Sequence, residues 1–179
     1  MAWLNTEERY GKLSVALHWF MLVLLTVIYV CMELRGYFPK GSAVREGMKA
    51  WHFMLGLTVP MLVALRLIAR ALGRTPIITP PLVRWQHGLS QATHGALYVF
   101  MIAMPILGWL TLSAAGKPIP FFGFELPALV AADKAFSRQV LEIHELIGKL
   151  GYGIIGLHAL AALYHHYFVR DNTLQRILP

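Results

Sequence analysis

The sequence predicts an all-α integral membrane protein, folded as a four-helix bundle. Two observations lead to this fold class. First, 57% of the 179 residues are hydrophobic and only 14% are charged. Second, four apolar stretches each reach the roughly 20 residues that a helix needs to cross a hydrocarbon core about 30 Å thick. Because backbone polar groups in a bilayer must be paired inside each segment, these stretches are expected to form helices that pack as a bundle.

The four predicted helices lie near residues 14–34, 48–70, 89–113 and 143–169. We expect them to form one transmembrane domain over residues 1–179. The first helix is expected to stay in the membrane, because its apolar run is too long for a secretory signal and no small-x-small cleavage site follows it.

Proline-containing connections separate the predicted helices. Residues 74–81 contain Pro76, Pro80 and Pro81, which disfavour helix and predict an extended surface strap. We place His87 in this connection, as a surface residue. Residues 115–139 form the longest connection, and their apolar stripe predicts a segment that lies along the membrane surface.

The positive charges favour membrane partners over nucleic acid. The net charge is +7, but the basic residues are scattered between apolar spans, which favours contact with anionic lipid or small anions. An even number of helices puts both termini on one side. Lysine and arginine are almost balanced between the two sides, so we place the termini in the cytoplasm because Arg9 and Lys12 precede the first helix.

Histidines are the unexpected feature of so apolar a chain. Ionisable residues inside a membrane are costly and usually functional. Neutral imidazole binds haem iron, and two facing helices can supply one ring to each side of the metal. The chain contains eight histidines: His18, His52, His87, His94, His144, His158, His165 and His166.

Depth in the membrane sorts four of these histidines into two pairs. His18 and His158 belong to the cytoplasmic half of their helices, and His52 and His144 to the outer half. His144 and His158 are 14 residues apart, which corresponds to about 21 Å along a helix and a rotation of about 40°. The spacing predicts two stacked haems, one bound by His18 with His158 and the other by His52 with His144.

Small residues between the paired histidines support this prediction. Gly148 and Gly151 follow His144, and Gly56 lies one turn after His52. These glycines either allow close helix packing or leave a slot for porphyrin. The chain has no Cys-x-x-Cys-His motif, so the haem is expected to be held without thioether bonds, as b-type haem.

Several alternatives stay open at this point. His94 could replace His18 at the cytoplasmic iron, and all four histidines could instead be polar residues bonded to neighbouring helices. His165 and His166 are either solvated interfacial residues or a pair that delivers protons or binds quinone. Arg66 could pair with a haem propionate or extend toward the interface.

The residues also resemble those of the bacterial cytochrome b561 family, and specifically its superoxide oxidases, over nearly the whole chain. The likeness includes Leu17-His18-Trp19, residues 32–39 (MELRGYFP), His52 and Thr75-Pro76. Its most specific part is the C-terminal run GYGIIGLHALAALYHHYFVRDNTLQRILP. The resemblance implies a di-haem b cytochrome of the bacterial inner membrane, with the four paired histidines as its axial ligands.

This resemblance also implies a function. Superoxide oxidases pass electrons from periplasmic superoxide through two haems to ubiquinone, and we expect no obligate protein partner for such an enzyme. Basic residues on the outer side would raise the local concentration of the anionic substrate. The nearest alternative is a b-type electron-transfer subunit that links a dehydrogenase or hydrogenase to the quinone pool. A third reading is a non-redox transporter that uses its histidines as proton relays.

Overall fold

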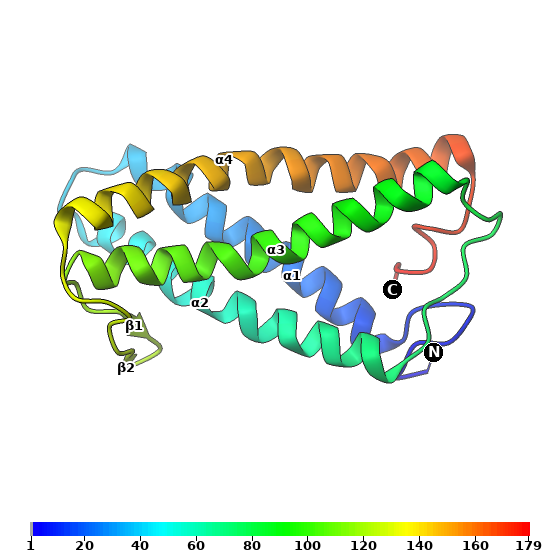
Figure 1. Cartoon of the computed structure of the whole chain (residues 1–179), viewed down its shortest axis with the longest axis horizontal. Coiled ribbons are helices and arrows are strands. Elements are labelled where there is room, and N and C mark those ends of the chain that lie inside the picture. The colour runs from blue at the N-terminus through cyan, green and yellow to red at the C-terminus, as the bar shows by residue number, and fades with distance from the viewer. Residues whose placement is uncertain (1) are drawn as a thin grey trace. The chain divides into compact units, whose positions relative to one another are not determined.

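Four long helices dominate the computed structural model, which describes residues 2–179 (Figure 1). They are α1 (Lys12–Leu34), α2 (Ala43–Leu72), α3 (Arg84–Ala114) and α4 (Lys134–Tyr164). Two short turns extend them: the 3₁₀ turn η1 (Arg35–Tyr37) after α1, and the π-helical turn η2 (His165–Val169) after α4. Among the described residues, all four helices are long and apolar enough to cross a membrane. The predicted fold class, an all-α membrane protein with four spanning helices, is confirmed.

Every helix contributes to two compact units. The first comprises the chain up to Phe20, Leu62–Phe100 and Lys149–Pro179; we call it the terminal unit because it holds both chain ends. The second comprises Met21–Met61 and Met101–Gly148; we call it the hairpin unit. Whether the chain acts as the single domain expected from its sequence stays a prediction.

Polar caps explain why three helices begin earlier than the apolar pattern predicts. The Ser42 hydroxyl accepts a hydrogen bond from the Arg45 N–H (3.3 Å) and so caps α2. The Gln86 side chain accepts one from the Val83 N–H (3.3 Å) at the start of α3. The Asp133 carboxylate accepts bonds from two N–H groups in the first turn of α4. As a result α4 begins at Lys134 rather than near 143, and His87 lies inside α3 rather than in the preceding connection.

The hairpin unit contains a feature that the sequence did not predict. Strands β1 (Pro120–Phe121) and β2 (Phe124–Glu125) pair antiparallel, with Phe121 opposite Phe124. The two residues between them, Phe122 and Gly123, have φ angles of 45° and 89°, and positive φ at both central positions is typical of a type I′ hairpin turn. Ile119, just before β1, anchors the hairpin. Its side chain is buried, and its carbonyl oxygen accepts a hydrogen bond from the Leu126 N–H (2.9 Å).

In the terminal unit, the two chain ends hold the α2–α3 strap. The carbonyl of Glu7 accepts a hydrogen bond from the Ile77 N–H (2.8 Å). On the other side, Asn172 forms three bonds: its side-chain oxygen accepts from Thr79 N–H, its amide donates to the Ile77 carbonyl, and its backbone N–H donates to the Thr79 carbonyl. The strap therefore has no regular secondary structure but is fixed by polar contacts.

Gly11 marks the tightest approach in this network. A Cβ at Gly11 would lie 2.4 Å from the carbonyl carbon of Leu4 and from the carbonyl oxygen of Trp3, so no side chain fits there without moving the chain. We predict that Gly11→Ala lowers the free energy of unfolding by about 1–3 kcal/mol, the usual cost of overpacking. Gly47→Ala is the matched control, because a Cβ at Gly47 meets nothing within 4 Å and alanine favours helix. Thermal unfolding in detergent, followed by circular dichroism, measures both; equal effects of the two substitutions would contradict the prediction.

Candidate functional site

In the hairpin unit, a histidine of α2 faces a histidine of α4. The ring centroids of His52 and His144 are 6.2 Å apart, and their planes are inclined by 77°. The Nδ1 atom of His52 lies 3.1 Å from the carbonyl oxygen of Ile28 in α1. Because a carbonyl only accepts, Nδ1 carries the proton of this bond. In the neutral ring the Nε2 lone pair is then left free for a metal.

Glycines leave room around these two rings. A Cβ at Gly108 of α3 would lie 3.5 Å from the Cε1 atom of His144, so α3 approaches the His144 ring without a side chain between them. Gly56, one turn after His52, has no heavy atom within 4 Å of the position that a Cβ would take. Nδ1 of His144 is buried and makes no hydrogen bond of normal geometry. The space beside His52 and His144, and the missing hydrogen bond at Nδ1 of His144, suit rings that bind a bulky cofactor.

In the terminal unit, three histidines come together from three helices. The ring of His158 in α4 has its centroid 6.3 Å from that of His18 in α1, with planes inclined by 56°. The ring of His94 in α3 is closer to His158, at 5.3 Å. Nδ1 of His94 lies 2.7 Å from the Ser90 carbonyl oxygen one turn earlier and donates to it.

Ring spacing tests whether these histidines fit haem. A bond of about 2 Å joins a metal to an imidazole nitrogen, so two rings on opposite sides of one iron have centroids about 6 Å apart. His52 with His144 (6.2 Å) and His18 with His158 (6.3 Å) match this spacing. His94 with His158 (5.3 Å) is about 1 Å too close for opposite sides of one ion. The residues present therefore fit haem with two histidine ligands, and the spacing favours His18 over His94.

Arg66 supplies a positive charge beside the terminal-unit histidines. It belongs to α2, which brings no histidine to this unit, and its guanidinium lies 6.0 Å from the centre of the Tyr98 ring. Its charge acts on both His18 and His158. The ion pairs found among residues 2–179 do not include Arg66. A half-buried arginine without a carboxylate partner suits an anionic group such as a haem propionate.

At the end of α4, His165 forms an ion-pair contact that the sequence did not reveal. Its Nδ1 atom is 2.6 Å from the Oδ2 atom of Asp171, whose side chain is fully buried. Burial raises the pKa of Asp171, but hydrogen bonds from Thr173 and His165 outweigh this effect and hold the pKa below the ordinary aspartate value. His166 differs from its neighbour, because its buried Nδ1 atom makes no hydrogen bond. His87 is exposed, as expected for a surface residue.

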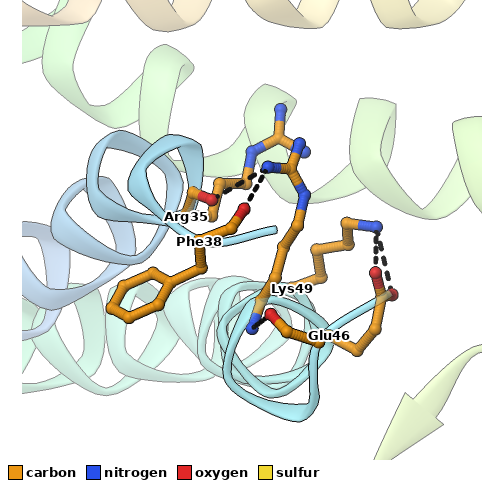
Figure 2. A network of polar contacts seen from close by, with 6 residues as sticks. Arg35, Phe38, Glu46 and Lys49 are labelled. Atoms are coloured by element: carbon orange, nitrogen blue, oxygen red, sulfur yellow. Dashed lines mark hydrogen bonds and ion pairs between the residues drawn. The ribbon is translucent and has the colours of Figure 1, made fainter. Parts of the chain in front are cut away.

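Basic residues of the hairpin unit lie in η1 and in the first turns of α2 (Figure 2). The Arg45 guanidinium donates to the carbonyl oxygens of Arg35 (3.0 Å) and Phe38 (2.9 Å), which joins the start of α2 to the end of η1. Lys49 pairs with both carboxylate oxygens of Glu46, at 2.7 and 3.0 Å. The side-chain charge of Arg35 lies close enough to His52 to act on its ring. The charge of Arg35 is thus held near this histidine pair, whereas the charge of Lys49 is matched by that of Glu46.

The pKa of Asp171 leads to a prediction about pH. Because folding lowers this pKa, the carboxylate stabilises the fold at pH values above the ordinary aspartate pKa of about 4, and this contribution is lost as the pH falls below it. We predict that wild type melts at a higher temperature than Asp171→Asn at pH 7. The difference in melting temperature should shrink steadily as the pH falls from about 5 to about 3. Thermal unfolding across this range measures it. A difference that stays constant or grows in acid would contradict the prediction.

Comparison with known proteins now identifies the family. The family model described as prokaryotic cytochrome b561 matches residues 9–179. Cytochrome b561 homolog 1 of Escherichia coli (strain K12) is 37% identical over 172 residues, which cover 96% of this chain and 98% of the relative. The probable superoxide oxidase CybB of Yersinia pestis is 34% identical over 173 residues, 97% of each chain. Cytochrome b562 of Cereibacter sphaeroides is 26% identical over 184 residues, 98% of each chain.

A family match along almost the entire chain agrees with the four spanning helices and with histidine pairs that fit haem. The chain belongs to the prokaryotic cytochrome b561 family, and it is accordingly a multi-pass inner-membrane cytochrome of electron transport with b-type haem as its cofactor.

Proposed function

We propose that this protein is a superoxide:ubiquinone oxidoreductase, which oxidises superoxide to dioxygen and passes the electrons through two b-type haems to ubiquinone. The observation that carries the proposal is the presence of two histidine pairs, each joining two helices at the spacing of axial ligands. The relative from Yersinia pestis, a probable superoxide oxidase that is 34% identical, supports this choice among the functions of b cytochromes.

Each haem in this proposal is held by side chains of α4 and one other helix. His52 and His144 would bind one haem, and His18 and His158 would bind the other. The haems supply one-electron redox chemistry; the protein supplies ligation, charge and access. In the terminal unit, Arg66 would bind a propionate and thereby neutralise its charge within the membrane. His94, which is too close to His158 to be its opposite ligand, would border the same haem.

The overall reaction needs two electrons and two protons. Two superoxide ions and one ubiquinone, with two protons, give two dioxygen molecules and one ubiquinol. Superoxide is a small anion, so a field of positive charge near the electron-entry site raises its local concentration and its rate of encounter. Arg35, which acts on His52, and the neighbouring Arg45 support entry of electrons at the hairpin-unit haem.

The terminal unit offers a place for quinone. His165 and His166 lie in the π-helical turn η2, and such turns are frequent at functional sites. His165 follows His158 by seven residues, which corresponds to two helical turns and about 10 Å along nearly the same face. In the proposed enzyme, His165 contacts the ubiquinone and gives it protons that come from the cytoplasm.

The direct test of this function uses the purified, haem-loaded protein in detergent. A steady flux of superoxide should reduce the haems, and a soluble ubiquinone analogue should then reoxidise them. Superoxide dismutase should abolish the reduction. If superoxide leaves the haems oxidised while dithionite reduces them, the proposed function is wrong, and an electron-transfer subunit that needs a partner dehydrogenase or hydrogenase becomes the better account.

Haem content tests the four ligands separately. We predict that His18→Ala and His158→Ala each remove one haem per chain, and that His52→Ala and His144→Ala each remove the other. A lost axial ligand leaves the iron with one protein bond, so binding weakens. His94→Ala and His87→Ala are the controls and should keep both haems. Loss of a haem from His94→Ala but not from His18→Ala would overturn the assigned pair.

The charge of Arg35 should affect the rate of haem reduction by superoxide more than the charge of the nearby exposed Lys40 does. We predict that Arg35→Gln lowers the second-order rate of haem reduction by superoxide by about threefold at low salt, because it removes a charge beside the entry site. Lys40→Gln removes the same charge from the same loop, where the side chain is exposed, and should have a smaller effect. The Arg35 carbonyl that binds Arg45 is unchanged in the variant. Equal rates for the two variants, or an Arg35 effect that persists in high salt, would contradict the prediction.

A further inference from the structure

A buried carboxylate lies beside the last turn of α4. The turn η2 is followed by Arg170, whose backbone is left-handed (φ 58°, ψ 37°). This conformation reverses the chain, and the Asp171 N–H then donates to the His165 carbonyl (3.2 Å). The reversal returns the Asp171 side chain to the His165 ring, where only 2% of the residue stays exposed.

Both carboxylate oxygens of Asp171 have a defined partner. Oδ1 accepts the Thr173 N–H at 2.8 Å, and Oδ2 lies 2.6 Å from Nδ1 of His165. The charge of the buried Arg176 also acts on this carboxylate. An ionised carboxylate has no proton to donate, so the proton of the short bond belongs to Nδ1 of His165.

This bond decides what the other ring nitrogen can do. With Nδ1 holding its proton toward Asp171, Nε2 alone gains and loses a proton as the ring changes charge. The His165 side chain is 16% exposed, so the ring is partly open to its surroundings. Because Nδ1 is engaged with Asp171, Nε2 is the ring nitrogen that is left to meet a ligand.

We propose that Asp171 is a positioning residue that fixes the tautomer of His165, so that Nε2 is the atom that delivers protons to the quinone. The proposal rests on the function proposed above and names the group that acts on the acceptor. As superoxide electrons reach the quinone, the Nε2–H bond of protonated His165 breaks and an O–H bond forms on a quinone oxygen. One of the two protons that the reaction consumes then passes from the cytoplasm to Nε2, and a second passage of electron and proton completes the ubiquinol.

A purely structural role for Asp171 predicts a different pattern of effects. The C-terminal tail, residues 171–179, is already held at two other points. Asn172 bonds to Thr79 and Ile77, and the Trp19 indole donates to the Ile177 carbonyl (2.9 Å). In Asp171→Asn the side-chain oxygen can still accept from Thr173. Its NH₂ group, however, would donate to Nδ1 of His165 and so move the ring proton to Nε2, the reversed tautomer.

The test compares Asp171→Asn, His165→Gln and the double variant in haem-loaded protein reduced with dithionite, so that superoxide is not needed. Reoxidation is measured with a soluble ubiquinone analogue and, separately, with ferricyanide, which takes electrons without protons. We expect Asp171→Asn to lower kcat with the quinone by about tenfold to a hundredfold, with little change in KM, in haem content or in the ferricyanide rate. In the His165→Gln background, the same change should cause no further loss.

Two further variants complete the design. Asp171→Glu restores a carboxylate and should recover part of the quinone rate. Asn172→Ala loosens the same tail without touching His165, so it should lower thermal stability and leave kcat unchanged. An Asp171→Asn loss that persists in the His165→Gln background, or that is equal with ferricyanide, would overturn the proposal. Wild-type haem that quinone reoxidises but superoxide cannot reduce would instead defeat the proposed function and leave this inference standing.

Discussion

The spacing of two opposed imidazole rings is the constraint on which the rest of this molecule depends. Helices in a bilayer satisfy their own backbone groups, and lipid gives no hydrophobic force that pushes them together. Few side chains are fully buried in the described chain, and large apolar residues such as Leu22, Leu65 and Leu160 are exposed, as expected where lipid is the solvent. A metal held between rings of different helices would therefore be a principal cross-link of the bundle.

The four helices contribute different residues to the histidine pairs. In both units α4 provides one ring of each pair, while α1 and α2 each provide a partner in one unit only. Helix α3 contributes space rather than a ligand in the hairpin unit, through Gly108 beside His144. In the terminal unit its His94 comes too close to His158 to bind from the opposite side of one ion. The same helix thus shapes both sites without belonging to the proposed ligand set.

The polar network at the chain ends connects three parts of the terminal unit. Asn172 fixes the strap, Trp19 binds the tail next to His18, and Asp171 holds the His165 ring. Asn172 and Ile177 of the C-terminal tail thereby contact distant segments, whereas Asp171 contacts the end of the preceding helix. The tail therefore links the ligand helix α1, the strap and the proposed quinone site.

The sequence predicted the parts of this account that depend on composition and helical period. Apolar runs predicted four spanning helices; matched depth predicted two histidine pairs, whose role as haem ligands stays a prediction. It missed the early helix starts, because short polar caps such as Ser42 and Asp133 extend a helix beyond its apolar run. The Phe122-Gly123 turn lacks the usual asparagine or aspartate, so the hairpin gave little signal. The contact between His165 and Asp171 depends on a left-handed residue at Arg170, which no pattern in the sequence indicates.

The central claim is that two pairs of histidines each hold a haem, and the ratio of haem to protein chain tests it most directly. Protein purified from haem-sufficient cells should contain two haems per chain, and both should give the low-spin spectrum of iron with two imidazole ligands. One haem per chain, or a high-spin spectrum from iron with an open axial position, would contradict the account.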